Sequence, residues 1–194
     1  MTRRILFVSP AMNPSLRRAR FDDNGPLDDS GRNAARAAAG SLPPADSVVR
    51  SPSARCEETA HELGLGPASS PPDVAGMAMG PWRGRTLEEV GAAEPEALAR
   101  WLSDPHFAPD GGEPVASVCA RVGRWLDATA ADEHGSGRVI AIVEPEVVRA
   151  AVVHAMGAPH TTFWRLDVPP LTLTELSGRS GRWNVRLGRP LGPH

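Results

Sequence analysis

Few side chains in this 194-residue chain stand where they could do chemistry. Ser9 follows the apolar run Ile5 to Val8, and a serine nucleophile needs a general base and an oxyanion site. Pro10, the next residue, can neither donate nor accept a proton. Glu144, much later in the chain, would be an unusual base for a serine. A serine-based reaction is therefore disfavoured.

Glu144 belongs to the stretch Glu144-Pro145-Glu146, which is typical of a helix start. Acids around the positive end of a helix stabilise it by ~0.3 to 1 kcal/mol, and this would be a sufficient reason for both residues. The alternative is that these carboxylates face a pocket, where Glu144 could donate or accept a proton. The local sequence leaves both interpretations open.

Metal and cofactor chemistry have no support in the sequence. The two cysteines, Cys56 and Cys119, lie in separate predicted helices, and no run of neighbouring Cys or His offers four metal ligands. The six histidines are isolated from one another. We predict free thiols, no metal and no cofactor.

The composition indicates one soluble globular domain. The formal net charge is -2, 41% of the residues are hydrophobic, and all 21 basic residues are arginine. A near-neutral balance gives no long-range attraction for nucleic acids. The N-terminus passes directly into a four-residue apolar run, too short for a signal peptide or a membrane span. We expect a cytoplasmic protein without membrane or nucleic-acid partners; its oligomeric state is not predictable from the sequence.

Strands and helices are expected to alternate along the chain. Continuous apolar runs predict parallel strands at 5–8, 48–49 and 139–143, and alternating patterns predict edge strands at 171–176 and 183–187. Caps and helical spacing predict helices at 28–39, from Ser51-Pro52 to Gly64 or Gly66, at 86–89, 95–102 and 114–131, and after Pro145. The fold class is a three-layer α/β/α domain with a mainly parallel central sheet.

Four motifs in order resemble the histidine phosphatase superfamily, the phosphoglycerate mutase-like proteins, over nearly the whole chain. Pro26-Leu27-Asp28-Asp29-Ser30-Gly31 is similar to the family's Pro-Leu-Thr-x-x-Gly helix start, and residues 51–60, Ser-Pro-Ser-Ala-Arg-Cys-Glu-Glu-Thr-Ala, match Ser-Pro-x-x-Arg-x-x-x-Thr-Ala at every fixed position. Gly80-Pro81-Trp82-Arg83-Gly84 matches Gly-x-Trp-x-Gly, and residues 143–149 resemble Ser-His-Gly-Gly-Val-Ile-Arg. The resemblance implies a single such domain over 1–194. The Pro, Gly and Met content of residues 66–84 indicates a loop insertion there.

The resemblance also implies roles that most of the matching positions cannot fill. In such enzymes a His attacks phosphorus, two Arg and a second His hold the phosphoryl oxygens, and a Glu protonates the leaving oxygen. At these positions Ser9 replaces the first Arg, Pro10 the nucleophile, Glu144 the second His and Gly76 the acid. Only Arg55 remains.

The loss of positively charged groups and the gain of the Glu144 carboxylate argue against a weak phosphatase. A carboxylate facing a phosphoryl group at ~4 Å opposes it by roughly 4 kcal/mol at an effective dielectric of ~20. We therefore predict that Arg55 and Glu144 form a salt bridge across the former phosphate site.

The residues around this pair are expected to form a ligand pocket. The candidates are Ser9, Arg55, Met77, Trp82, Glu144 and Glu146, with Met12 and Met79 as further parts of an apolar lid. Packing of the Met and Trp side chains onto the domain surface is the favoured alternative. Arg20 lies in a loop that borders the substrate in the resembled proteins, where a solvated position is favoured over binding of an acidic group.

Two classes of function remain open. In the first, the chain is a pseudoenzyme whose pocket binds a small organic ligand or serves a regulatory role, without phosphatase or mutase activity. In the second, it is a cofactor-free acid-base enzyme of isomerase, cyclase or lyase type, with Glu144 as the catalytic group and Arg55 as the anion anchor. The first is favoured slightly, because catalysis needs several converging groups and the sequence offers one convincing pair.

Overall fold

A five-stranded mixed sheet forms the centre of the protein. The computed structural model describes residues 2–132, 137–179 and 181–192. The strand order is β2 (Ser47–Arg50), β3 (Arg138–Ile142), β1 (Arg3–Val8), β4 (Thr172–Arg179) and β5 (Arg182–Pro190). Strands β2, β3 and β1 are parallel, whereas β4 and β5 are antiparallel to their neighbours. The α/β fold class predicted from the sequence is confirmed.

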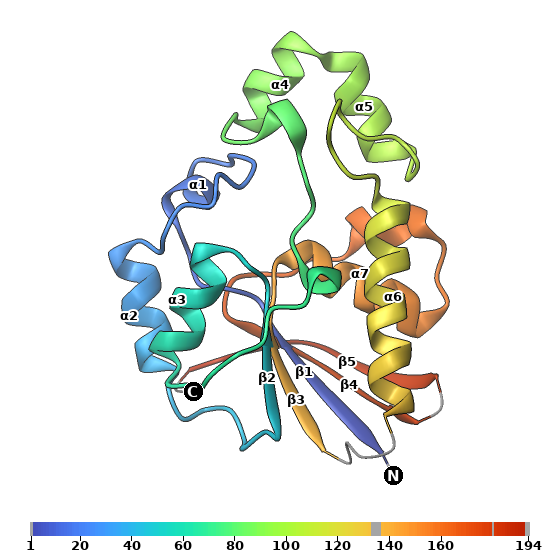
Figure 1. The fold of residues 1–194 in the computed structure, drawn as a ribbon. Helices are drawn as coiled ribbons and strands as arrows, with labels where there is room; N and C mark the ends of the chain where they lie inside the picture. The colour runs from blue at the N-terminus through green and yellow to red at the C-terminus, as the bar shows by residue number, and fades with distance from the viewer. Residues whose placement is uncertain (1, 133–136, 180, 193–194) are drawn as a thin grey trace.

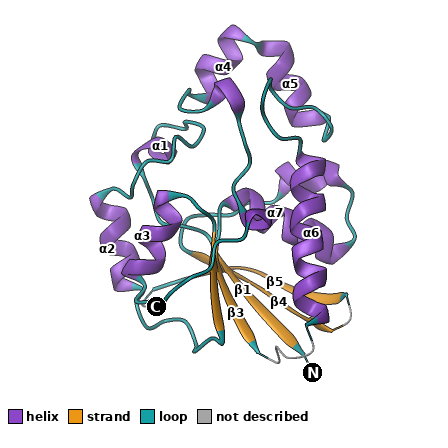
Figure 2. Ribbon diagram, in the orientation of Figure 1, coloured by secondary structure: helices purple, strands orange, loops and turns teal. Residues whose placement is uncertain are grey.

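Apolar strands buried on both faces explain the layers. In β1 the side chains of Ile5 and Phe7 enter one core cluster, and those of Leu6 and Val8 enter the other. On the Leu6 side lie α2 (Asp29–Ala37) and α3 (Ala54–Glu62); on the Ile5 side lie α6 (Val115–Ala131) and α7 (Pro145–Met156) (Figure 1). Figure 2 shows the same helix, sheet and helix layers by secondary structure.

The remaining elements gather beyond the carboxyl ends of the parallel strands. They are α1 (Pro14–Arg17), α4 (Leu87–Ala93), α5 (Pro95–Ser103) and the 3-10 segments η1 (Pro72–Val74), η2 (Gly80–Trp82) and η3 (His160–Arg165). Figure 1 shows α4 and α5 standing away from the sheet. Helix α4 begins with a capping box in which Thr86 and Glu89 each bond the other's backbone N–H. The segment 66–84 contains η1 and η2 and no longer helix.

Two sequence predictions about elements were wrong. The helix expected to start at Pro52 begins at Ala54, because the Ser53 side chain caps it by accepting from the Cys56 N–H. Strand β4, expected at an edge, lies between β1 and β5. Its polar residues Thr172 and Thr174 are buried, and the Thr172 hydroxyl donates to the carbonyl of Pro169 at 2.8 Å.

Both cysteines are free, as predicted, and both are buried. Burial raises the pKa of Cys119 to about 11, and burial followed by the charge of Glu144 raises the pKa of Cys56. In the described part of the chain, no helix is long and apolar enough to cross a membrane.

Gly31 lets α2 approach the loop that leaves β1. A Cβ placed on Gly31 would lie 2.1 Å from the backbone oxygen of Met12, which accepts a hydrogen bond from Asp28 N. We expect Gly31→Ala to lower the free energy of unfolding by about 1–3 kcal/mol, the usual cost of overpacking, in urea titrations followed by circular dichroism.

Gly66→Ala is the matched control. A Cβ at Gly66 meets no heavy atom within 4 Å, so this variant should be as stable as the original chain or slightly more so. Equal stability of the two variants would contradict the close contact at Gly31.

Candidate functional site

The candidate site lies where the three parallel strands end. Ser9 follows β1, Ser51 follows β2 and Val143 follows β3, and backbone hydrogen bonds hold these ends in register. Crevices at the carboxyl ends of parallel strands are where open α/β folds bind ligands. Arg55 comes from the first turn of α3, and Glu144 from the residue that precedes α7.

Arg55 and Glu144 form a buried, two-pronged ion pair, which confirms the prediction from the sequence. Arg55 Nε donates to Glu144 Oε1 at 3.1 Å, and Arg55 Nη2 donates to Oε2. The side chains are 6% and 3% exposed. Ser53 Oγ also donates to Oε1, at 2.5 Å, so every oxygen of the carboxylate has a donor.

The ion pair, and not the helix terminus, holds the Glu144 carboxylate. Its side chain makes no capping hydrogen bond to α7, although its residue occupies the N-cap position. Burial lowers the pKa of Arg55, but the charge and hydrogen bonds of Glu144 outweigh this effect and raise the pKa overall. Arg55 is therefore charged and neutralised in place.

Gly76 adjoins this pair and leaves room for it. A Cβ on Gly76 would lie 3.0 Å from Glu144 Cγ, so a longer side chain there would press on the glutamate. The resemblance expects an acid at position 76. In this chain the space beside Gly76 is occupied by the side-chain methylene groups of Glu144.

A cavity of about 250 Å³ opens beside the ion pair. Its lining residues are Pro10, Asn13, Ser15, Leu16, Arg20, Phe21, Asp22, Arg55, Met77, Met79, Trp101, Pro145, Glu146, Arg149, Trp164, Val168 and Pro170. A second cavity of about 290 Å³ adjoins it and shares Asp22, Met77, Met79 and Glu146 with it. Glu144 lines this second cavity only.

Aromatic rings form one side of the first cavity, and we call Phe21, Trp101 and Trp164 the aromatic wall. The ring centroids of Trp101 and Trp164 lie 4.2 Å apart, and those of Phe21 and Trp101 lie 5.6 Å apart. Trp82 packs behind this wall, 5.6 Å from Phe21 and 5.8 Å from Trp101. Rings packed at these separations stabilise one another beyond their buried area and hold the wall in place.

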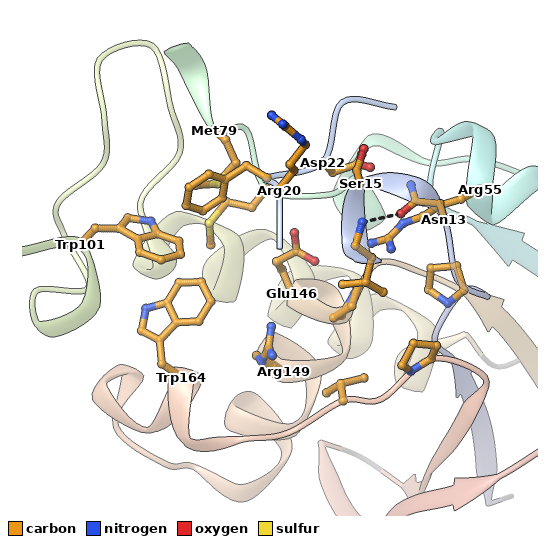
Figure 3. Close-up of a pocket in the computed structure, with 17 residues that line it drawn as sticks. Asn13, Ser15, Arg20, Asp22, Arg55, Met79, Trp101, Glu146, Arg149 and Trp164 are labelled. Atoms are coloured by element: carbon orange, nitrogen blue, oxygen red, sulfur yellow. Dashed lines mark hydrogen bonds between the residues drawn. The ribbon is translucent and has the colours of Figure 1, made fainter. Parts of the chain in front are cut away.

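Charged groups occupy the opposite side. Figure 3 shows Glu146 and Arg149 rising from α7 across from Trp101 and Trp164. Burial and the charge of Glu144 raise the pKa of both Glu146 and Asp22, and Arg55 opposes this shift. Burial lowers the pKa of Arg149, whose Nε donates to the Leu166 carbonyl at 2.8 Å.

The structure brings together some of the residues predicted from the sequence and separates others. Arg55, Met77, Met79 and Glu146 line the first cavity, and Arg20, favoured as a solvated residue, lines it too. Ser9, Met12 and Trp82 do not line either cavity.

The side chains of Ser9 and Trp82 are engaged inside the fold. Ser9 Oγ donates to the Pro169 carbonyl at 2.5 Å and accepts from Thr172 N at 3.0 Å. Trp82 is fully buried and donates to Glu94 at 3.1 Å. Neither side chain is free to contact a ligand in this cavity.

The lining residues that were not predicted as site residues include Asp22, Trp101, Arg149 and Trp164. Arg149 could have been found, because it lies three residues after Glu146 and so on the same face of a predicted helix. Trp101 lies in the helix predicted at 95–102, and it is buried. Among the described residues, no group of three or more His, Cys, Asp or Glu side chains could hold a metal ion.

Removing one partner of the ion pair should be costly. Glu144→Gln leaves the buried Arg55 without its counter-charge, and we expect a loss of about 3–5 kcal/mol in the free energy of unfolding. The double variant Arg55→Leu/Glu144→Leu should recover most of that loss, because no buried charge remains. Urea titration measures both.

Arg124→Gln is the surface control for this experiment. Arg124 pairs with Asp73 at 3.6 Å with side chains 69% and 39% exposed, so the change should cost less than about 1 kcal/mol. A Glu144→Gln loss as small as this one would contradict a buried ionised pair.

Glu146 should lower the stability of the free protein near neutral pH. Its pKa is raised above the ordinary value of 4.5, so the folded state loses stability as pH rises through the folded pKa. We expect Glu146→Gln to raise the melting temperature at pH 7 and to leave it unchanged below pH 4.5, where the carboxyl is protonated in both states. Scanning calorimetry at both pH values checks this, and an equal effect at the two would contradict it.

Similar folds occur among solved bacterial enzymes. A structure described as mycobacterial hydrolase 1 is 24% identical, with a TM-score of 0.86 over 99% of this chain and 100% of its own. A mycobacterial glucosyl-3-phosphoglycerate phosphatase complexed with VO3 is 24% identical, with a TM-score of 0.84 over 97% and 99% of the two chains. The alpha-ribazole phosphatase of Shigella flexneri is 17% identical, with a TM-score of 0.84 over 98% of each chain. At these identities the likeness establishes the fold.

No curated protein matches the sequence significantly. The model of one protein family does match, over residues 12–189, which is most of the chain. Its description is the histidine phosphatase superfamily, branch 1. The match covers the ion pair, strands β2 to β4, nearly all of β5, and every residue that lines the cavity except Pro10. The chain therefore belongs to the histidine phosphatase superfamily.

Proposed function

We propose that this member of the superfamily has no phosphatase or mutase activity. We propose further that its cavity binds a small organic ligand or serves a regulatory role. The Arg55–Glu144 ion pair carries the proposal. The one arginine that the resemblance would assign to phosphoryl binding is already bonded twice to a carboxylate and is 6% exposed. An incoming phosphoryl group would have to displace that carboxylate or lie against it.

The nucleophile's position supports the same conclusion. Pro10 lines the cavity where the resemblance expects a histidine, and its ring nitrogen carries no proton and no lone pair for attack. No histidine is among the residues that line either of the two described cavities. The similar solved proteins named above include two phosphatases, but fold likeness at 17–24% identity does not carry their chemistry.

The ligand proposal rests on the cavity itself. It combines an aromatic wall with a few convergent charged groups, the usual character of small-molecule sites. Two of those groups, Asp22 and Glu146, have raised pKa values because of burial, which makes them functional candidates.

Acid-base catalysis is the second candidate function. The cavity favours it with Glu146, in place of Glu144, as the group that transfers the proton. Both carboxylate oxygens of Glu144 already accept hydrogen bonds from Arg55 or Ser53. Glu146 faces the cavity, and its raised pKa brings it closer to the neutral range in which a general acid works. If the protein is a cofactor-free isomerase, cyclase or lyase, Glu146 is the group we would assign to proton transfer.

The absence of phosphatase chemistry can be tested directly. We expect no turnover of p-nitrophenyl phosphate above the buffer rate, and no rise in melting temperature with vanadate or inorganic phosphate, because Glu144 opposes each oxyanion. Arg55→Leu/Glu144→Leu serves as the control for contamination, since any activity that it retains does not come from this site. Turnover in the original chain that vanishes in this double variant would overturn the proposal.

A further inference from the structure

We propose that the cavity selects an organic cation: a small amine on a flat apolar body, with the ammonium group facing Asp22 and Glu146 and the body lying against Trp101 and Trp164. This inference rests on the proposed function in so far as the cavity binds a ligand, and it adds the chemical class of that ligand.

Unpartnered buried polar atoms concentrate at this cavity. Five buried side-chain nitrogen or oxygen atoms lack a hydrogen-bond partner within the described residues, and three belong to its lining: Asp22 Oδ1, Trp101 Nε1 and Trp164 Nε1. A buried polar atom without a partner lowers the stability of the fold, because it has lost its hydrogen bonds to water. An ammonium group would donate to Asp22 Oδ1 and relieve the cost there, whereas the two indole N–H groups are donors that need an acceptor elsewhere on the ligand.

The unpaired charges of the lining are mostly negative. Asp22 Oδ1 has no donor, and within the described chain no side chain donates to the Glu146 carboxyl or forms an ion pair with it. Both carboxyls also experience the negative charge of Glu144, which raises their pKa together with burial. A cation placed between them would stabilise the charged form of both.

The arginines of the lining are largely occupied. Arg55 is bonded to Glu144, and Arg20 donates to the Gly84 carbonyl at 2.7 Å and lies 3.5 Å from Glu89. Arg149 bonds the Leu166 carbonyl, and its guanidinium lies 5.5 Å from the Trp164 ring centroid. An anionic ligand could pair only with Arg149 among these arginines, and the carboxylates of Asp22 and Glu146 would repel it.

The aromatic wall suits the same ligand. Indole faces pack well against flat apolar rings, and such ring pairs stabilise one another beyond the area that they bury. Figure 3 shows the Trp101 and Trp164 rings on one side of the space and the Glu146 carboxylate reaching toward it from the other. The volume of about 250 Å³ lies below the ~300–1,000 Å³ of drug-sized pockets, so the body is small, about one or two rings.

Three probes of equal size separate charge from shape: 2-phenylethylamine, 2-phenylethanol and phenylacetate. Each is titrated into the full chain by calorimetry and by tryptophan fluorescence, in a buffer free of amines. We expect the amine to bind roughly tenfold more tightly than the alcohol, and phenylacetate to bind most weakly.

Variants locate the effect. Asp22→Asn and Glu146→Gln should each reduce the preference for the amine severalfold and leave the affinity for 2-phenylethanol unchanged. Glu88→Gln is the matched control, because Glu88 is exposed and outside the cavity, and it should keep the full preference. Trp164→Leu should weaken amine and alcohol alike. Circular dichroism of each variant confirms that it is folded.

The outcomes separate this inference from the function on which it rests. Binding of phenylacetate as tight as that of the amine, or an amine preference that persists in both carboxyl variants, overturns the cation assignment and leaves a ligand-binding cavity. Failure of all three probes to bind up to their solubility limits overturns both. Phosphatase turnover would overturn the proposed loss of activity alone.

Discussion

The structure at the carboxyl edge of the parallel strands depends on the buried ion pair of Arg55 and Glu144. Arg55 stands in the first turn of α3, where the positive end of the helix disfavours a cation. Glu144 precedes α7 on the opposite face of the sheet and supplies the missing negative charge. Because α3 and α7 cover different faces, their ion pair joins both helical layers across the carboxyl edge of the parallel strands (Figure 1).

This neutralisation shapes the electrostatics of the cavity next to it. An unpaired Arg55 would stabilise nearby carboxylates, but its charge is matched by Glu144, and Glu144 itself repels Asp22 and Glu146. Both acids are half-buried, and neither has a full counter-charge. Such groups cost stability in the free protein, which is a common property of binding sites and an uncommon one of inert scaffolds.

The sequence predicted most of the framework because it is encoded locally. Apolar runs specify the parallel strands, and Asp28 and Thr86 cap the helices that follow them, as predicted. The ion pair was predictable because the resemblance places both partners at the former phosphate site. The aromatic wall was not, since Trp101 on α5 and Trp164 on η3 approach only through the packing of distant segments. The position of β4 was missed because its buried threonines resemble solvent-facing ones.

The two parts of the site come from different layers of structure, and this separation bears on how function can change within one fold. Phosphoryl chemistry, in the resemblance, depends on a few side chains at the strand ends, where Pro10 and Glu144 now stand. The aromatic wall comes from α5, η3 and the loop after α1, which lie outside the sheet. Substitutions at the strand ends can therefore abolish one chemistry without removing the walls of the cavity. Under the proposed function, ligand binding is what the fold retains when the strand ends no longer hold phosphate.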